Sequence, residues 1–390
     1  MRYGRILAVA AAALAIGAGP GGAQVQGVTD TEIKLGGHMD LSGPLTFWGV
    51  PMRNGHVMRV EEQNAKGGVH GRKITMIIED NGYDPKKGVL ATQKLLQQDK
   101  VFAIVGILGT PVALASMPLV IEAGLPHMYP GSPHRAMFEP YHKLKFTLSA
   151  TYDDMARAGV KYMVEKLGKK RIAILYQDDD FGKDIRDATA QQAKKMNIPV
   201  VAVTSYKRGD TAFSSQVARM KQENPDLVVL ATIVRETAGV GAEMKKIGWQ
   251  VDVMTTAAAC NAGVPALGKD AVEGFYAQCQ YVPFDPPNEP ASLQDWLKRY
   301  QAKFNTPATE AAAIGYNMQE LMMLAFERAG KNLTVDSFIA ATESIKGWQD
   351  IFGTPPITFS RDQHIGVRAF VMTRITGGKF KRIAGPLTDQ

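Results

Sequence analysis

Three consecutive aspartates and two cysteines are the side chains of this chain whose types could support metal or thiol chemistry. Asp178, Asp179 and Asp180 follow an apolar segment and precede a helical one. Carboxylates at this place interact favourably with the partial positive charge of a helix N-terminus. We therefore expect a solvated loop here and not a metal cluster. Cys260 and Cys279 lack the supporting histidines of a metal site. The sequence predicts no metal and no other cofactor.

The two cysteines have a second possible role, as a disulfide in an oxidising compartment. Cys260 and Cys279 each lie near the end of a predicted strand, so contact between them is possible. The sequence alone leaves open whether they are bridged.

The glycine signatures of nucleotide-binding and hydrolytic enzymes do not occur where an enzyme would need them. No G-x-G-x-x-G follows a predicted strand, since Gly106 and Gly109 stand alone, and neither G-x-x-x-x-G-K-[ST] nor G-x-S-x-G is present. We therefore expect a protein that is not an enzyme. A regulatory amide or signal sensor of the same fold class is an alternative, and an export signal would argue against a cytoplasmic one.

The elements that would position functional loops alternate between strand and helix, as in α/β proteins with parallel sheets. A first set has strands at 33–35, 74–78, 102–105, 125–129 and 146–148, with helices at 52–64, 85–98 and 111–122. A second set has strands at 171–176, 200–205, 227–232 and 251–254, with helices at 183–196, 213–223 and 239–247. A strand at 276–281, helices at 293–304 and 311–329, and a terminal hairpin at 368–373 and 380–383 follow. These patterns predict two doubly wound units.

The opening unit places an aromatic side chain beside a strand end. The strand at 33–35 ends in a glycine- and proline-containing turn at 39–44, and Trp48 lies at the tip of the loop predicted at 45–49. Open α/β sheets bind ligands in the crevice outside the carboxyl ends of their strands. We therefore expect a binding site at the ends of these strands.

The N-terminus has the pattern of a secretory signal peptide. Arg2 and Arg5 precede an apolar run at 6–16, too short to span a bilayer, and small residues before Gln24 offer a cleavage site. We expect a signal peptide at 1–23 and an exported periplasmic protein that is not embedded in the membrane. Removing the two arginines lowers the net charge from +7 to +5. The remaining basic residues are scattered and form no basic–aromatic RNA motif, so nucleic acid is not an expected partner.

Several short pieces occur in one order along nearly the whole mature chain. They are Leu41-Ser-Gly-Pro44, Trp48-Gly49, Asn64-Ala-Lys-Gly-Gly68, Gly71, Asp80, Pro85, Phe181-Gly182, Asp210, Phe213 and Glu273-Gly274. In these pieces the chain resembles the periplasmic solute-binding proteins of ABC transporters, of the leucine/isoleucine/valine-binding type. The resemblance implies two lobes joined by three crossovers, with ligand in the cleft. Lobe 1 would comprise 28–148 and 278–355, and lobe 2 would comprise 149–277 and 356–390. It also implies permease and ATPase partners, and we expect a monomer.

The resemblance also implies which residues line the cleft. Trp48 matches an aromatic that packs on the ligand. The loop with Gly109 and Thr110 matches the one that holds a carboxylate, and the loop with Gly131 and Ser132 adds further polar contacts. From the second lobe, Phe181 matches an aromatic contact.

Departures from the amino-acid-binding pattern indicate a different ligand. Ala257 stands where amino-acid binders carry the acid for the ammonium, and an ammonium buried without a carboxylate costs several kcal/mol. Pro133 stands near a usual threonine, and small residues at 311–313 replace an aromatic. Arg235 could meet a carboxylate in a bidentate contact.

These departures lead to the hypothesis of an aromatic carboxylate, of the benzoate or hydroxycinnamate type. Trp48 and Phe181 would stack on its ring. Its polar groups would be held by Thr110, Ser132, Arg235 and His134, and Tyr152 would face the cleft from the first crossover. If the loop alignments slip by a residue or two, Glu236 or Asp153 supplies the missing acid. A branched-chain or other aliphatic amino acid, or an amide, is then the ligand.

Overall fold

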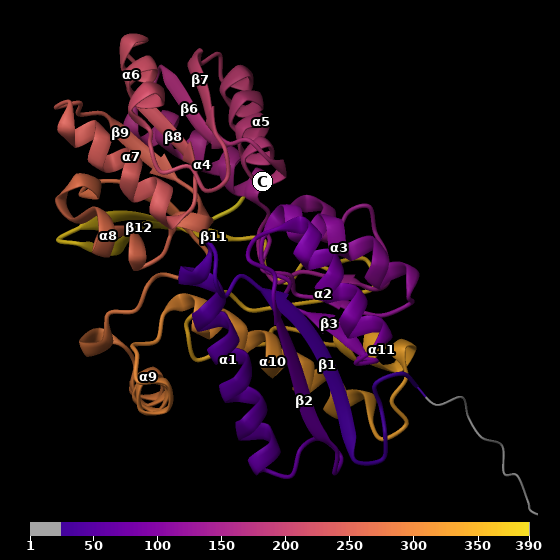
Figure 1. The fold of residues 1–390 in the computed structure, drawn as a ribbon. Helices are drawn as coiled ribbons and strands as arrows, with labels where there is room; N and C mark the ends of the chain where they lie inside the picture. Colours follow the sequence, from indigo (N-terminus) through magenta and orange to yellow (C-terminus); the bar gives the residue numbers. More distant parts are fainter. Residues whose placement is uncertain (1–24, 390) are drawn as a thin grey trace, which may run out of the picture.

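The computed structural model describes residues 25–389, so the expected signal peptide at 1–23 lies outside the described residues. The chain forms two lobes, each built around one sheet (Figure 1). The first sheet is parallel throughout, in the order β2-β1-β3-β4-β5. Its strands are β1 Glu32–Met39, β2 Lys73–Asp80, β3 Ala103–Val105, β4 His127–Met128 and β5 Lys145–Phe146.

The second sheet has seven strands in the order β12-β11-β10-β9-β8-β6-β7. They are β6 Ile172–Gln177, β7 Val200–Tyr206, β8 Leu227–Ala231, β9 Asp252–Thr255, β10 Tyr276–Cys279, β11 Phe370–Thr376 and β12 Lys379–Leu387. The strands from β7 to β10 are parallel, whereas β11 and β12 add an antiparallel edge. The predicted terminal hairpin is thus confirmed, and it extends the second sheet.

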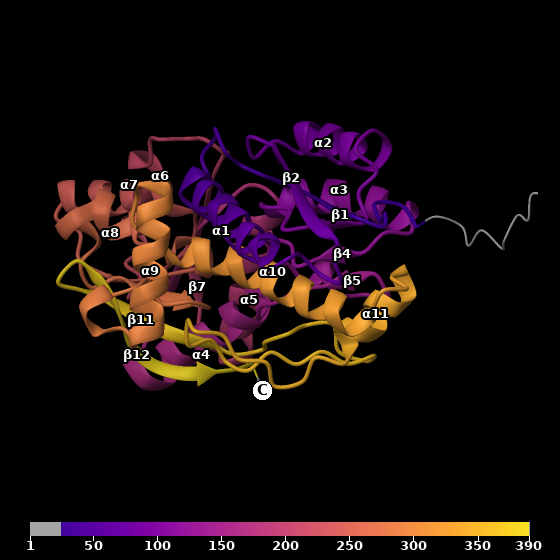
Figure 2. The ribbon, with the colours of Figure 1, turned by 90° about the horizontal axis from the view of Figure 1, so that it is seen from below.

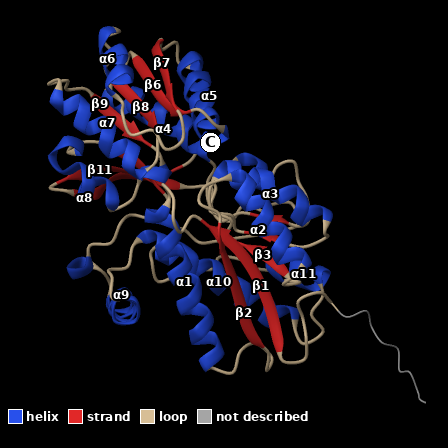
Figure 3. Cartoon of the chain, in the orientation of Figure 1, coloured by secondary structure: helices blue, strands red, loops and turns tan. Residues whose placement is uncertain are grey.

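Helices cover the faces of both sheets (Figures 2 and 3). In the first lobe α1 packs against α10, and α2 against α3; in the second, α4 packs against α5, and α7 against α6 and α8. Their bounds are α1 Thr46–Ala65, α2 Pro85–Gln97, α3 Thr110–Glu122, α4 Tyr152–Leu167, α5 Asp180–Lys195, α6 Ser214–Gln222, α7 Val234–Lys246, α8 Gly263–Gly268, α9 Ala291–Phe304, α10 Glu310–Ala329 and α11 Val335–Glu343. Short 3₁₀ turns lie at η1 Arg135–Met137, η2 Ala257–Ala259, η3 Lys269–Val272 and η4 Pro286–Asn288.

The predicted class, two α/β lobes with parallel sheets, is confirmed, but the opening loop differs from the prediction. Residues 46–49 are the first turn of α1, so Trp48 is helical and does not lie at a loop tip. The carboxylate of Asp40 accepts the backbone N–H groups of Ser42, Gly43 and Leu45. This side chain closes a turn directly after β1, and the helix therefore starts earlier than its hydrophobic spacing indicates.

The chain passes between the sheets three times, and sheet membership moves two of the predicted lobe limits. Strand β10, ending at Cys279, belongs to the second sheet. Phe359 packs on Tyr129 and Phe146 of the first lobe, and Ile365 bridges to Thr147 beside β5. The last passage therefore follows Ile365, later than the boundary predicted at 355. We propose that lobe 1 comprises 28–148 and 280–366, and that lobe 2 comprises 149–279 and 367–389.

Helices α1 and α10 lie side by side at unusually close range (Figures 1 and 2). A Cβ at Gly55 would lie 2.0 Å from the carbonyl oxygen of Ala312, and one at Gly315 would lie 2.1 Å from that of Met52. Real Cβ atoms do not approach backbone so closely, so each position requires glycine.

In the part of the chain that the structure describes, no helix has both the length and the hydropathy for a membrane crossing.

Three of the buried histidines in the first lobe have a lowered pKa. His38 is hydrogen-bonded to Thr92 at 2.9 Å and to Asn81 at 3.1 Å. Desolvation lowers the pKa of His38 and of His56 from 6.5 to about 3, and that of His127 to about 4. Each ring is therefore neutral in the folded protein at neutral pH.

We predict that the free energy of unfolding falls as the pH drops from 6.5 towards 4. The unfolded chain takes up protons on these rings below pH 6.5, whereas the folded core does so only near pH 3 to 4, so acid favours unfolding. Neither ring nitrogen of His127 has a hydrogen-bond partner among the described residues. His127→Leu should therefore reduce this loss of stability, measured by urea unfolding at pH 7 and pH 4.5. The exposed His70→Asn is the control, and an unchanged pH dependence in His127→Leu would contradict the prediction.

Candidate functional site

A cavity lies between the two lobes, with about 690 Å³ of space free of atoms when its open mouth is included. Its walls come from both sheets. The first-lobe wall comes from loops after β1 to β5, from the loop after β10 and from α10, and the second-lobe wall from loops after β6, β8 and β9. The described cavity is therefore at the carboxyl ends of parallel strands, as expected for open α/β sheets.

Most of the wall is apolar or aromatic. The aromatic side chains in it are Trp48, Tyr83, Tyr152, Phe181 and Tyr281. The aliphatic residues are Leu45, Met52, Leu108, Leu148, Ile233, Ile314 and Met318, and Pro130, Pro133, Ala257 and Ala258 complete the apolar part. The polar side chains are Thr110, Ser132, Ser149 and Gln280. A wall of this kind suits a small ligand with a ring or chain and few polar groups.

One end of the cavity can hold an anion. Thr110 is the first residue of α3, and its hydroxyl forms a 2.8 Å hydrogen bond with that of Ser132. Among the described residues, the backbone N–H groups of Thr110 and Ser132 donate to no protein acceptor. Free N–H groups at a helix N-terminus, together with hydroxyls, are a recurring way to bind a carboxylate or similar anion.

The aromatic walls are held in place by contacts within and between the lobes. The indole N–H of Trp48 on α1 donates to the carbonyl oxygen of Ala258 in the second lobe at 2.9 Å. The rings of Tyr152 and Phe181 meet edge to face, with centroids 5.1 Å apart. The Tyr152 hydroxyl donates to no described residue. Burial first, and then the charges of Asp184 and Asp179, raise the pKa of Tyr152, so its hydroxyl remains a neutral donor.

No charged side chain lines the cavity among residues 25–389. Glu236 is buried, and desolvation raises its pKa to about 7, but it lies behind the wall. Asp153 is paired with Arg135 at 2.7 Å and with Arg157 at 3.2 Å, also outside the cavity. Neither of the two acids that the sequence offered as alternatives for an ammonium therefore contacts the space.

Most of the residues proposed from the sequence are brought together at this cavity. They are Trp48, Gly109, Thr110, Gly131, Ser132, Tyr152, Phe181 and Ala257. Gly109 has a φ of 100°, which favours glycine, and a Cβ there would lie 2.6 Å from the ring of Tyr83. The role of these residues in binding stays a prediction.

Two residues predicted to hold polar groups of a ligand lie outside the wall of this cavity. Arg235 is exposed near the start of α7 and points across the mouth towards Gly43 and Thr46, at 3.4 and 3.3 Å, because Ile233 occupies the wall. His134 also lies outside the cavity wall, with its Nε2 atom 4.0 Å from Asp184. The role of either side chain in binding stays a prediction.

Two further sequence interpretations are resolved by burial and capping. Residues 311–313 do not enlarge the cavity, because they are buried and Ala312 packs closely against α1. Asp179 caps α5 by accepting the N–H groups of Phe181 and Gly182, and Asp178 pairs with Lys183 at 3.0 Å. Among the described residues, no cluster of His, Cys, Asp and Glu is arranged to hold a metal.

The sequence interpretation missed part of the wall, including Tyr83, Tyr281, Ile314 and Met318. Tyr83 follows β2 and so obeys the rule of strand ends that also drew attention to the loop with Trp48. Ile314 and Met318 lie one turn apart on α10, the helix that packs against α1. That position depends on helix packing between distant segments, which a single sequence does not reveal.

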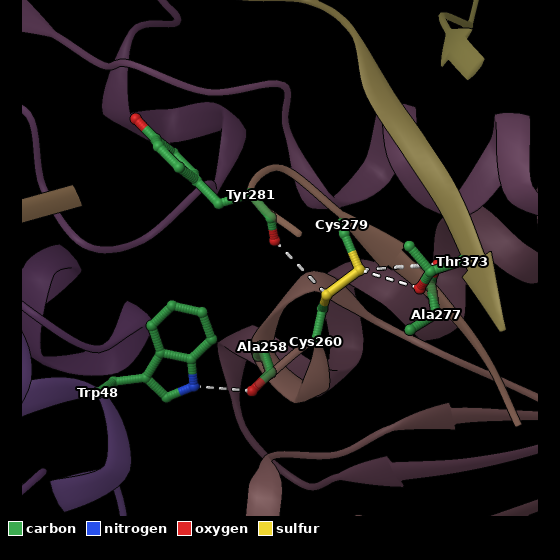
Figure 4. Close-up of a disulfide and its surroundings, with 7 residues drawn as sticks. All are labelled: Trp48, Ala258, Cys260, Ala277, Cys279, Tyr281 and Thr373. Atoms are coloured by element: carbon green, nitrogen blue, oxygen red, sulfur yellow. Dashed lines mark hydrogen bonds between the residues drawn. A yellow bond between two sulfur atoms is a disulfide. The ribbon is translucent and has the colours of Figure 1, made fainter. Parts of the chain in front are cut away.

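A disulfide supports the second-lobe wall. Cys260 and Cys279 are bonded, with Cα atoms 5.5 Å apart. The bond ties the turn that carries Ala257 and Ala258 to the end of β10 (Figure 4). Figure 4 also shows the indole of Trp48 donating to Ala258, so the bonded turn receives a contact from the opposite lobe.

The chain is similar to binding proteins. The family model described as "Periplasmic binding protein" matches residues 32–379. A Leu/Ile/Val-binding protein, BraC3, from Rhizobium johnstonii is 23% identical over 89% of this chain and 93% of its own length. An amino acid binding protein from Pseudomonas aeruginosa is 25% identical over 62% of this chain, and the match spans 66% of that relative's length.

Solved structures share the fold. A branched-chain amino acid ABC transporter protein from Thermus thermophilus with bound valine has a TM-score of 0.83 at 18% identity, over 91% of this chain and 96% of its own. A fatty acid ABC transporter substrate-binding protein from Thermomonospora curvata has a TM-score of 0.84 at 24% identity, over 94% and 95%. At these identities the likeness establishes the architecture and not the ligand.

We predict that the variant Cys260→Ser/Cys279→Ser lowers the free energy of unfolding by about 3 kcal/mol. The bond joins residues 19 positions apart, and closing a loop of this length removes conformational entropy from the unfolded chain. Denaturant unfolding of oxidised wild type and of the variant measures the difference. Wild type with reductant is the control and should match the variant. Equal midpoints for the oxidised wild type and the variant would contradict the prediction.

Proposed function

The chain belongs to the periplasmic binding protein family, and we propose that it is the solute-binding component of an ABC importer, capturing a small carboxylate by hinge closure. We further propose that this ligand is an aromatic acid of the benzoate or hydroxycinnamate type. Capture of this kind needs no catalytic group, in line with a family of binding proteins and not enzymes.

The observation that carries the choice of ligand is the absence of any charged side chain from the described cavity wall. An ammonium closed into this space would lose its water without gaining a carboxylate, which costs several kcal/mol. Ala257 lines the wall, the resemblance to amino-acid binders would require an acid at this position, and the alternative acids lie outside the wall. A ligand without an amine avoids this cost.

The cavity also offers partners for the two parts of an aromatic acid. Its carboxylate would accept the free N–H groups of Thr110 and Ser132, and the O–H of whichever of their two hydroxyls does not donate to the other. Its ring would lie between Trp48 and Phe181, with Tyr152 as a free donor for a ring substituent. These contacts involve neutral dipoles, so one negative charge is matched and no positive charge is required.

A branched-chain or other aliphatic amino acid is the second candidate. The relatives named as binding leucine, isoleucine and valine favour it. In that case the ammonium would be held by carbonyl and hydroxyl oxygens alone. We propose a periplasmic location, a monomer, and a membrane permease with its ATPases as partners in either case.

A ligand screen tests the proposal directly. Mature protein, unfolded and refolded to remove bound ligand, is melted with benzoate, 4-hydroxybenzoate, p-coumarate, leucine or valine. A ligand at about 100 times its dissociation constant stabilises the protein by about 2.7 kcal/mol, which raises the melting temperature measurably. We predict that aromatic acids raise it and amino acids do not. A shift with leucine or valine alone would support the second candidate and contradict the aromatic acid.

We predict that Ala257→Asp weakens binding of the aromatic acids at least ten-fold relative to Ala257→Asn. The two side chains have nearly the same size, but a buried carboxylate repels a bound carboxylate and would pair with an ammonium. Titration calorimetry with 4-hydroxybenzoate and with leucine measures both effects. Equal affinities of the two variants for 4-hydroxybenzoate would show that position 257 does not face the charged part of the ligand.

A further inference from the structure

We propose that Arg208 and Gln177 form a clasp on Tyr83 that sets ligand affinity by stabilising the closed lobes, without touching the ligand. The inference rests on the proposed capture of a ligand in the cavity and adds residues outside the cavity wall to that mechanism. Tyr83 belongs to the first lobe, whereas Arg208 and Gln177 belong to the second.

Tyr83 connects the clasp to the ligand site. It follows β2, and its ring lines the cavity. The ring lies directly on the backbone of Gly109, where a Cβ would be only 2.6 Å away. Gly109 precedes Thr110, the start of the anion-binding turn. A fixed Tyr83 ring therefore supports both the wall and this turn.

Arg208 grips the backbone and the ring of Tyr83 together. It lies in the loop between β7 and α6, and its Nη1 atom donates to the carbonyl oxygen of Tyr83 at 2.7 Å. Its guanidinium carbon lies 4.8 Å from the centroid of the Tyr83 ring. A hydrogen bond from a charged donor and a cation–π contact are both stronger than neutral surface contacts.

Gln177 and Asp179 complete the clasp. The side-chain N–H₂ of Gln177, at the end of β6, donates to the Tyr83 hydroxyl at 2.9 Å and to Asp179 at 2.6 Å. The Tyr206 hydroxyl donates to the Gln177 oxygen at 3.2 Å and so fixes the orientation of the amide. Asp179 also accepts the N–H of Phe181, so the aromatic walls of both lobes are linked to one network.

These contacts cross from one lobe to the other, so they exist only when the lobes are together. Apparent affinity depends on the population of the binding-competent closed state. A contact that stabilises this state therefore raises the apparent affinity for every ligand by the same factor. The clasp should therefore change affinity and dissociation rate without changing the preference among ligands.

The test is Arg208→Ala in the full mature protein, with 4-hydroxybenzoate, p-coumarate and leucine as probes. We expect about ten-fold weaker binding of every probe that wild type binds, by a common factor and through faster dissociation, measured by calorimetry and stopped-flow fluorescence. Arg208→Lys, which keeps the charge and loses the forked geometry, should lie between. Arg208 also lies 3.4 Å from Asp179 of its own lobe, so Arg208→Ala should lower the melting temperature of the ligand-free protein slightly, and the affinities are measured well below that temperature.

Arg186→Ala is a matched control. Its guanidinium also lies 4.8 Å from a tyrosine ring centroid, that of Tyr176, and its side chain is 27% exposed, as is that of Arg208. Both partners of this contact lie within the second lobe. Its removal should change affinity less than two-fold.

Each outcome decides a separate point. Wild-type affinity in Arg208→Ala, or a loss that differs between probes, overturns the clasp. If wild type binds no probe, the proposed ligand class fails, and the clasp is judged from small-angle scattering of ligand-free protein. There Arg208→Ala should be more open than wild type, and identical profiles overturn the clasp.

Discussion

The close contact between the backbones of α1 and α10 determines the shape of the first-lobe wall. Glycines at positions 55 and 315 let the two helices approach until no Cβ would fit between them. Trp48 and Met52 on α1, and Ile314 and Met318 on α10, then face the same cavity. Because this contact joins main chain to main chain, side-chain rearrangement cannot relax it, and a larger residue would displace a helix and the cavity wall with it.

The second-lobe wall is held differently, by covalent and polar ties to short turns. The disulfide joins the turn with Ala257 and Ala258 to β10 of the second sheet, and the Asp179 cap fixes the start of α5 beside Phe181. A wall fixed on both sides before ligand arrives loses little conformational entropy on binding, which favours affinity. The two lobes therefore have to adjust mainly in their relative position.

Much of the fold could be predicted because strand and helix periodicities are local, and parallel strands place their following loops together. Thr110, Ser132 and Phe181 lie in or beside such loops, but the resemblance to solute-binding proteins, and not the periodicity, pointed to them. Other features depend on single side chains or distant contacts: Asp40 starts α1 early, Ile233 takes the wall position expected for Arg235, and residues 357–366 return to the first sheet. Tyr83 obeys the same strand-end rule, yet its contacts with the second lobe appear only in three dimensions.

An uncharged wall also limits how many ionic groups a ligand can carry. Fixed backbone dipoles at the start of α3 can compensate one negative charge, but no described residue of the wall carries a positive charge. A second carboxylate in this space would be desolvated without a cation to pair with, at a cost of several kcal/mol. The cost of desolvating the additional negative charge would thus be enough to exclude dicarboxylates and phosphorylated metabolites, without any repelling charge in the wall.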